Sequence, residues 1–242
     1  MIKHTKHFST CTISQIQLGY FSIQMEEYQR AEVKKPQRTL LASNLYVINK
    51  QNDIWILDTG FSASLSIPFI EPRLKYAFTD VVLKYKQFHN VYIVLSHCHP
   101  DHIGGLMECF DDIAKKKWRV FVNLDELEPD YYNQFPEIPR FIEEKLKPYP
   151  FCLNLRYAEL FKPCYIGGHT PEHSILQIKD ESIYYPADIF PTEYHLKHIP
   201  IGERNFQQEH FLNIREQAIE QFRNEHATLL LAHAPNDGII SL

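Results

Sequence analysis

The chain has 242 residues, of which 44% are hydrophobic and 23% charged, and its formal net charge is −5. This composition is ordinary for a soluble globular protein. The negative charge argues against a nucleic-acid partner, because phosphate binding usually needs a basic patch. No apolar run is long enough for a membrane span, and residues 1–10 lack the apolar stretch of a signal peptide. Five scattered cysteines do not suggest a disulfide framework. We therefore expect a cytoplasmic protein with no nucleic-acid or membrane partner.

The hydrophobic pattern predicts strands and helices within a single domain that spans residues 1–242, with a flexible tail at 1–11. In chain order, the expected elements are a strand pair within 12–24, strands at 44–49 and 54–57, a helix within 73–88, a strand at 91–95, a helix at 105–116, a strand at 119–122, a proline-interrupted helical insert at 124–150, strands near 151–166, 173–179 and 182–186, a helix at 207–224 and a strand at 227–232. Sheets covered by helices, an α/β layer fold, account for this order.

The most informative feature is a cluster of metal-competent side chains at 97–102, where the sequence reads HCHPDH. It directly follows the strand expected at 91–95. Extended backbone would place His97 and His99 on one side and Cys98 on the other, so we expect Cys98 to be a buried, inert thiol. Asp101 and His102 follow, where the loop leads into the next helix. Imidazole and carboxylate donors at this density are typical of a transition-metal site.

Three more metal-competent residues follow strands that are distant in the sequence. His169 lies in a turn that begins with two glycines, Asp188 follows an apolar strand, and His233 follows the last predicted strand. Taken singly, these residues would be ordinary strand-end side chains, but together with the cluster they offer more donors than a structural zinc site uses. The set therefore predicts a catalytic site that could hold two metals. His173 is expected to pack or to form hydrogen bonds rather than to bind metal.

On these residues the chain resembles the metallo-β-lactamase superfamily, and the resemblance extends from Asp58 to His233. It implies the α/β (α+β) class, with a four-layer αββα sandwich of two mixed sheets flanked by helices. Asp58 is similar to the family's supporting aspartate, which orients a ligand imidazole. The resemblance also implies the ligands: a first metal held by His97, His99 and His169, a second held by Asp101, His102 and His233, and Asp188 bridging the two.

Individual positions narrow the branch of the superfamily. His99 stands where the di-iron flavoproteins have glutamate, and His102 stands where one subclass of the antibiotic-resistance enzymes has arginine. Glu172 and Ala187 stand where relatives commonly have glycine, and neither change removes a donor. The resemblance is to the branch of lactonases and hydroxyacylglutathione hydrolases, and these positions leave the subfamily open.

The loop after the bridging aspartate supplies candidate substrate contacts. Tyr194, His195 and His198 lie there. The family's homoserine-lactone hydrolases carry a tyrosine three residues after this aspartate; here Pro191 occupies the place, and Tyr194 is the candidate substitute. The aromatic residues of the 124–150 insert are expected in the core, with a lid or a substrate wall as the alternative.

We therefore expect a dinuclear hydrolase with two Zn²⁺ per chain, Fe or Mn being the alternative metals. Paired cations lower the pKa of a bridging water and so supply hydroxide. Asp101 is the expected proton shuttle to the leaving group. The expected partner is a small, partly apolar ester, lactone or thioester substrate, and homodimer formation is left open. The alternatives are a phosphodiesterase or phosphotriesterase, a mononuclear-iron persulfide dioxygenase, and a scaffold without catalytic activity.

Overall fold

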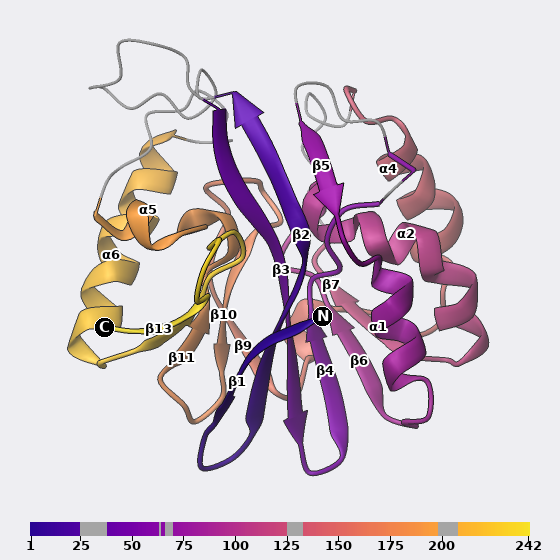
Figure 1. Ribbon diagram of the computed structural model, residues 1–242, viewed down its shortest axis with the longest axis horizontal. Helices are drawn as coiled ribbons and strands as arrows, with labels where there is room; N and C mark the ends of the chain where they lie inside the picture. The colour runs from indigo at the N-terminus through magenta and orange to yellow at the C-terminus, as the bar shows by residue number, and fades with distance from the viewer. Residues whose placement is uncertain (25–37, 63, 66–69, 125–132, 198–207) are drawn as a thin grey trace.

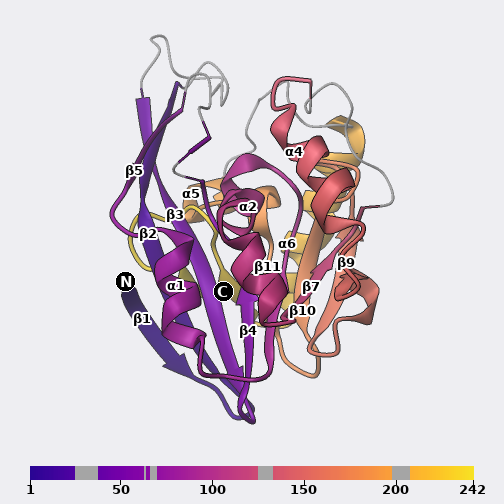
Figure 2. The same ribbon diagram turned by 90° about the vertical axis from the view of Figure 1, so that its right-hand side faces the viewer.

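The computed structural model describes residues 1–24, 38–62, 64–65, 70–124, 133–197 and 208–242. Within these residues, two mixed β-sheets pack against each other and helices cover both outer faces (Figure 1). A view turned by 90° shows the same layers (Figure 2). This is the predicted αββα sandwich. No helix in the described part of the chain has both the length and the apolarity that a membrane span requires.

The first sheet has the strand order β1-β2-β3-β4-β6-β7-β8, with β5 paired to β2. Strands β4, β6, β7 and β8 run parallel to one another, and the other pairs are antiparallel. Parallel strands end at one edge of a sheet, so the residues after β4 and after β6 lie close together. The strands are β1 Ile2–His7, β2 Thr12–Gln24, β3 Arg38–Lys50, β4 Asp53–Leu57, β5 Glu71–Leu74, β6 Val91–Val94, β7 Arg119–Val122 and β8 Cys152–Asn154.

The second sheet has the strand order β13-β12-β11-β10-β9. Only β11 and β12 run parallel in the described part of this sheet, so the chain leaves both of them at the same edge. The strands are β9 Phe161–Ile166, β10 Ser174–Ile178, β11 Ile183–Tyr185, β12 Thr228–Leu230 and β13 Ile239–Ser241.

Helices α1, α2 and α4 lie on the outer face of the first sheet, and α5 and α6 lie outside the second (Figure 1). Alpha-helix α4 continues into a π-helical turn at Ile142–Leu146, and short 3₁₀ turns lie at Leu155–Tyr157 and Ala187–Ile189. The helices are α1 Phe78–Tyr85, α2 Pro100–Lys115, α4 Glu137–Phe141, α5 Glu193–Lys197 and α6 Gln208–Asn224.

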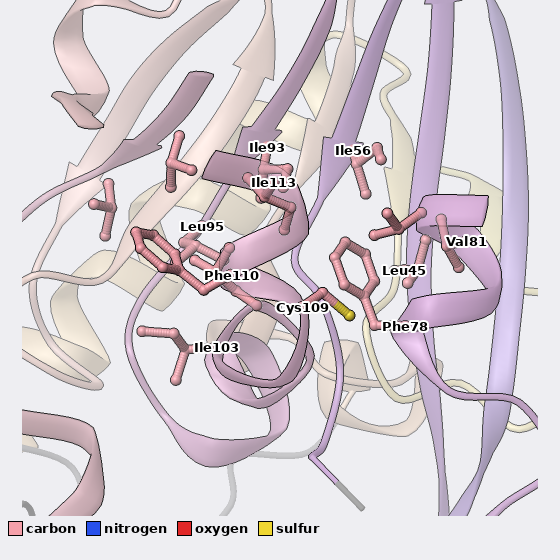
Figure 3. Packing of buried hydrophobic residues seen from close by; sticks show 14 of the residues in the cluster. Leu45, Ile56, Phe78, Val81, Ile93, Leu95, Ile103, Cys109, Phe110 and Ile113 are labelled. Atoms are coloured by element: carbon pink, nitrogen blue, oxygen red, sulfur yellow. The ribbon is translucent and has the colours of Figure 1, made fainter. Parts of the chain in front are cut away.

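Buried apolar side chains fill the three spaces between the four layers. Figure 3 shows the first, where Phe78 of α1 and Phe110 of α2 pack on Ile56 and Ile93 of the sheet. Between the sheets lies a second cluster, which includes Trp55 of β4. Under α6 lies a third, whose helical members recur every three or four residues: Phe211, Ile214, Ala218 and Phe222. Helix α6 thus buries the face that its periodicity predicts.

Several details differ from the sequence-based predictions, and β5, α5 and β13 were not predicted at all. The flexible tail predicted at 1–11 is wrong, because Ile2–His7 pairs with β2 and the ammonium group of Lys3 donates to the Pro235 carbonyl (2.7 Å). Residues 12–24 form one long strand rather than a strand pair. Helix α2 begins at Pro100, five residues before the predicted start, since proline is favoured at the first helical position.

The described part of the 124–150 insert belongs to the core. Phe135, Phe141 and Tyr149 are buried in the same cluster as the inner face of α2. Tyr149 also donates a hydrogen bond to the Trp118 carbonyl (2.7 Å). These aromatic residues are therefore core side chains rather than a substrate wall. The other two aromatic residues of the insert, Tyr131 and Tyr132, lie outside the described residues, so the lid stays a prediction.

Candidate metal centre

The first sheet delivers the HCHPDH cluster at its parallel edge. The chain leaves β6 at Val94 and reaches His97 three residues later. His99 has extended backbone (φ −66°, ψ 154°) and is the residue before the first turn of α2. Asp101 and His102 lie within that first turn, where a carboxylate interacts favourably with the helix dipole. The change from strand to helix therefore turns four donors toward one point.

The second sheet delivers the other three donors. His169 lies in the β9–β10 connection after Gly167 and Gly168, whose φ values of +91° and +87° favour glycine. Asp188 lies in the 3₁₀ turn after β11, and His233 follows β12. The backbone amide of Ser174 donates to the Ser96 carbonyl (3.1 Å) and joins the two edges beside the site.

Seven side chains meet in two groups that share Asp188. Within each group, one candidate ligand atom per residue lies within 4.8 Å of every other. The groups are His97, His99, His169 and Asp188, and Asp101, His102, Asp188 and His233. The structure thus brings together all seven residues that were predicted as metal ligands.

The carboxylate of Asp188 faces both groups. Its Oδ2 lies 3.3 Å from Nε2 of His169 and 3.8 Å from Nε2 of His97. Its Oδ1 lies 3.2 Å from Nε2 of His102 and 3.1 Å from Nε2 of His233. This is the arrangement that a carboxylate bridging two cations requires.

The outer ring nitrogen of three candidate ligands is held by a neighbouring group. Nδ1 of His102 contacts Asp58 (2.6 Å), Nδ1 of His233 donates to the Ala42 carbonyl (2.9 Å), and Nδ1 of His97 contacts the Ser96 hydroxyl (3.0 Å). Their Nε2 atoms therefore point inward. In the described part of the chain, neither these buried Nε2 atoms nor Oδ1 of Asp188 makes a hydrogen bond with favourable geometry, although Oδ1 lies 3.2 Å from Nε2 of His102 and 3.1 Å from Nε2 of His233. Buried polar atoms in this condition fit metal ligands.

Asp58 stands at the centre of the supporting contacts. Its Oδ1 accepts from the Ser96 amide (2.8 Å), and its Oδ2 accepts from the hydroxyls of Ser96 (2.8 Å) and Tyr185 (2.6 Å), beside the contact with His102. The residue has φ +56°, in the left-handed region. The sequence identified Asp58 but not Ser96 or Tyr185, because no local pattern marks a hydroxyl that reaches Asp58 from the neighbouring strand or from the other sheet.

Burial and neighbouring charges shift the pKa values of the candidate ligands in opposite directions. Burial lowers the pKa of His97 and His99 well below the usual range, and neighbouring imidazoles add to the effect. Burial alone would lower the pKa of His233 as well, but Asp188 and Asp101 outweigh it and raise this pKa to about 9. A cation bound beside His233 would replace its proton, as is usual for imidazole ligands.

Two candidate ligands define the accessible side of the site. The side chains of Asp101 and His169 are 15% and 13% exposed, whereas those of His97, His102, His233 and Asp188 are 6% exposed or less. Asp101 and His169 therefore form the solvent-facing side of the donor set.

The remaining sequence-predicted residues lie around the donors. His173 is buried with its ring centroid 5.0 Å from that of His97, which confirms packing, and Cys98 is buried in the apolar cluster as predicted. His195 is buried and its Nδ1 contacts the Thr192 hydroxyl (2.7 Å), whereas Tyr194 is half-buried. Neither belongs to the donor groups, so their contact with a substrate stays a prediction. His198 lies outside the described residues.

The two departures from the family pattern differ in conformation. Ala187 has φ +44°, in the left-handed region where a glycine fits without strain. Glu172 is fully buried beside His173 and does not have a positive φ. The strain at Ala187 therefore lies immediately before Asp188, where the surrounding fold must hold the backbone in place.

The model of the metallo-beta-lactamase superfamily matches residues 38–233. The chain belongs to this superfamily. The solved structure of AidC, a dizinc quorum-quenching lactonase in complex with the product N-hexanoyl-L-homoserine, is similar with a TM-score of 0.76 and 17% identity over 97% of this chain and 92% of that one. An N-acyl homoserine lactone hydrolase with this product bound at its catalytic metal centre has a TM-score of 0.70 and 16% identity, covering 94% and 95%. A probable metal-dependent hydrolase from Staphylococcus aureus has a TM-score of 0.73 and 14% identity, covering 98% and 94%. No curated relative matched the sequence.

Superfamily membership confirms the family predicted from the sequence and its two-sheet fold. It also confirms the prediction of a metal-dependent hydrolase at the level of the superfamily. At these identities, the similarity to individual solved structures concerns the fold alone.

Proposed function

We propose that the protein is a dinuclear hydrolase that holds two Zn²⁺ and cleaves a small, partly apolar lactone, ester or thioester. One observation carries the proposal: Asp188 directs one carboxylate oxygen to each of two groups of buried donors. A mononuclear centre would leave one group of buried imidazoles without a cation. His97, His99 and His169 would hold the first ion, and Asp101, His102 and His233 the second.

The bound cations would supply a hydroxide at neutral pH and polarise the substrate oxygen. The protein's own side chains would hold the ligand imidazoles in place and deliver a proton to the leaving group. Asp101, partly exposed and 3.3 Å from Nε2 of His233, would carry the proton to the leaving group on the accessible side. Asp58 would hold the ring of His102, and the Ala42 carbonyl that of His233.

The structural neighbours favour a lactone as the first substrate to test. Two of them carry N-hexanoyl-L-homoserine, the hydrolysed form of an acyl homoserine lactone. Tyr194, half-buried on the segment that follows Asp188, is the candidate to contact such a substrate, since Pro191 holds the position three residues after that aspartate. Thioesters and simple esters share the carbonyl chemistry and belong in the same panel.

The test measures metal content and turnover on one preparation made without chelator. We expect about two zinc ions per chain and hydrolysis of the lactone. Asp188→Asn should lower kcat/KM by roughly a hundredfold or more and reduce the metal content, because the bridging charge is lost. Asp180→Asn, the same change at an exposed turn, is the matched control and should behave like the unaltered protein.

Other outcomes would identify the competing functions. About one iron per chain together with oxygen uptake would contradict the hydrolase and favour a persulfide dioxygenase. Turnover of a bare phosphodiester but not of any lactone, ester or thioester would favour the phosphodiesterase. Full turnover in Asp188→Asn would contradict the proposed site.

A further inference from the structure

Arg215 is a buried cation on the inner face of α6. Its exposed fraction is 5%, and it lies among the apolar residues with which this helix covers the second sheet. Burial lowers its pKa to about 10, so the side chain keeps its charge at neutral pH. A charge removed from water persists only where nearby groups compensate for its lost hydration. The groups around Arg215 show what it does.

The guanidinium group clamps the segment that follows Asp188. One terminal nitrogen donates to the carbonyl of Ile189 and the other to the carbonyl of His195. The group also lies over the ring of Phe190, 4.5 Å from its centroid, and 5.6 Å from the centroid of Phe211. The planar guanidinium group therefore links Ile189 to His195, six residues further along the chain, and stacks on Phe190.

The clamped segment supports two donors of the second group. Ile189 is bonded in the chain to Asp188, whose neighbour Ala187 has a strained backbone (φ +44°). The Pro191 carbonyl, between the two clamped points, accepts a hydrogen bond from the backbone amide of His233 (2.8 Å). A shift of this segment would therefore move Asp188 and His233 together.

We propose that Arg215 is a positioning residue that holds Asp188 and His233 at the spacing a second metal ion requires. This inference rests on the proposed dinuclear centre. A lysine at position 215 would keep the charge but could not donate to both carbonyls in the same plane, and a small residue would lose both the charge and the hydrogen bonds. Asp188 belongs to both groups, but the other three donors of the first group, His97, His99 and His169, lie on other parts of the chain, whereas His233 of the second group is hydrogen-bonded to the segment. Loss of Arg215 should therefore weaken the second ion more than the first.

The test compares Arg215→Lys and Arg215→Ala with Arg223→Lys, a matched control at an exposed position of the same helix. Zinc affinities are measured by competition with a chromophoric chelator, and Co²⁺-loaded protein reports the coordination of each ion through its absorption spectrum. We expect the ion of the second group to bind about 10- to 100-fold more weakly in both Arg215 variants. The spectrum of that ion should change, and the control should match the unaltered protein.

Chemical rescue separates positioning from simple packing. Millimolar guanidinium should restore the affinity and the Co²⁺ spectrum of Arg215→Ala, while equal urea, which lacks the charge, should not. Circular dichroism identifies the variants that fold. If neither Arg215 variant folds, Phe190→Leu, which removes the stacked ring, takes their place and should show the same selective loss.

The outcomes separate this inference from the proposed function. The unaltered protein could hold two ions, and the folded Arg215 variants could hold both as tightly and with the same Co²⁺ spectrum. That result would overturn the role of Arg215 but not the dinuclear centre. A loss that guanidinium does not restore would also overturn it. An unaltered protein that holds fewer than two ions would overturn the dinuclear centre and this inference together.

Discussion

At the scale of single residues, the buried carboxylate of Asp58 is the best-supported part of the site outside the ligands. It accepts hydrogen bonds from the amide and hydroxyl of Ser96 and from the hydroxyl of Tyr185, and it contacts Nδ1 of His102 at 2.6 Å. A carboxylate so fully engaged has one orientation. It therefore fixes the ring of His102 and makes that imidazole a stronger ligand.

Asp58→Asn tests this support. The amide is similar in shape but has no charge, and it places a donor toward groups that already donate. We expect metal affinity to fall by roughly 10- to 100-fold, with a smaller effect on the fold. The matched control is Asp53→Asn. Asp53 begins β4, the strand that leads to Asp58, and it accepts a hydrogen bond from the Asn90 amide group. Equal affinities in a chelator competition would show that the carboxylate does not support the site.

At the scale of elements, the start of α2 is built against the loop that follows β4. The hydroxyl of Thr59 donates to the His102 carbonyl (2.6 Å) and accepts from the Leu106 amide (3.0 Å). The Gly105 amide donates to the Gly60 carbonyl (3.0 Å). The helix turn that carries Asp101 and His102 thus lies directly on the loop that carries Asp58.

Gly105→Ala should disturb the packing of α2 against this loop and so destabilise the fold. A Cβ atom at position 105 would lie 2.2 Å from the Thr59 carbonyl oxygen and 2.5 Å from Cβ of Phe78. Alanine favours helices, but this overlap with backbone should outweigh that gain and lower the free energy of unfolding by about 1–3 kcal/mol. Thermal unfolding measures the change. Asp112→Ala, at an exposed position of the same helix, should lie within about 0.5 kcal/mol of the unaltered protein; a Gly105→Ala variant equally stable would contradict the tight packing.

At the scale of the whole molecule, buried thiols make stability depend on alkaline pH. Cys109 is 2% exposed, and its side chain lies near Phe78 in the helical layer (Figure 3). Burial, together with nearby acidic residues, raises its pKa from 9.0 to about 12. The folded protein therefore keeps a proton that the unfolded chain releases, so stability is full below about pH 9 and falls as pH rises toward 12.

Urea unfolding at a series of pH values from 8 to 10.5 measures this dependence. Cys109 should contribute a slope of up to about 1.4 kcal/mol per pH unit above pH 9. Cys109→Ala should remove that contribution and flatten the curve, although the variant starts from a lower stability because the sulfur leaves a small cavity. Parallel curves for the two proteins would contradict the raised pKa.

The whole molecule also depends on contacts that join the two sheets near the site. The Tyr46 hydroxyl of β3 bonds to the carbonyls of Leu231 (2.8 Å) and Gly238 (2.9 Å), and the Asn44 amide group donates to the Ala234 carbonyl (2.8 Å). These bonds fix the segment of His233 against the first sheet. The site therefore forms only when both halves of the sandwich are in place.

Short-range pattern was enough to predict the layers and the donors. Alternation in strands and the three-to-four-residue repeat in helices depend on neighbouring residues, so β4, β6 and α6 could be located from the sequence. The HCHPDH cluster and the strand-end positions of His169, Asp188 and His233 likewise follow from local order and from the resemblance. For the same reason, residue order alone was enough to recognise the family.

Contacts between distant segments could not be predicted. The pairing of β1, the hydroxyl of Tyr185 on Asp58 and the guanidinium group of Arg215 each join residues far apart in the chain, and no local period records such a partner. The resemblance implied that Asp188 faces both groups, but the distances of its two oxygens from the histidines depend on how the sheets pack. The donors can therefore be identified from the sequence, but the distances between them cannot. Those distances depend on packing, because only the folded core brings the ends of separate strands to one point.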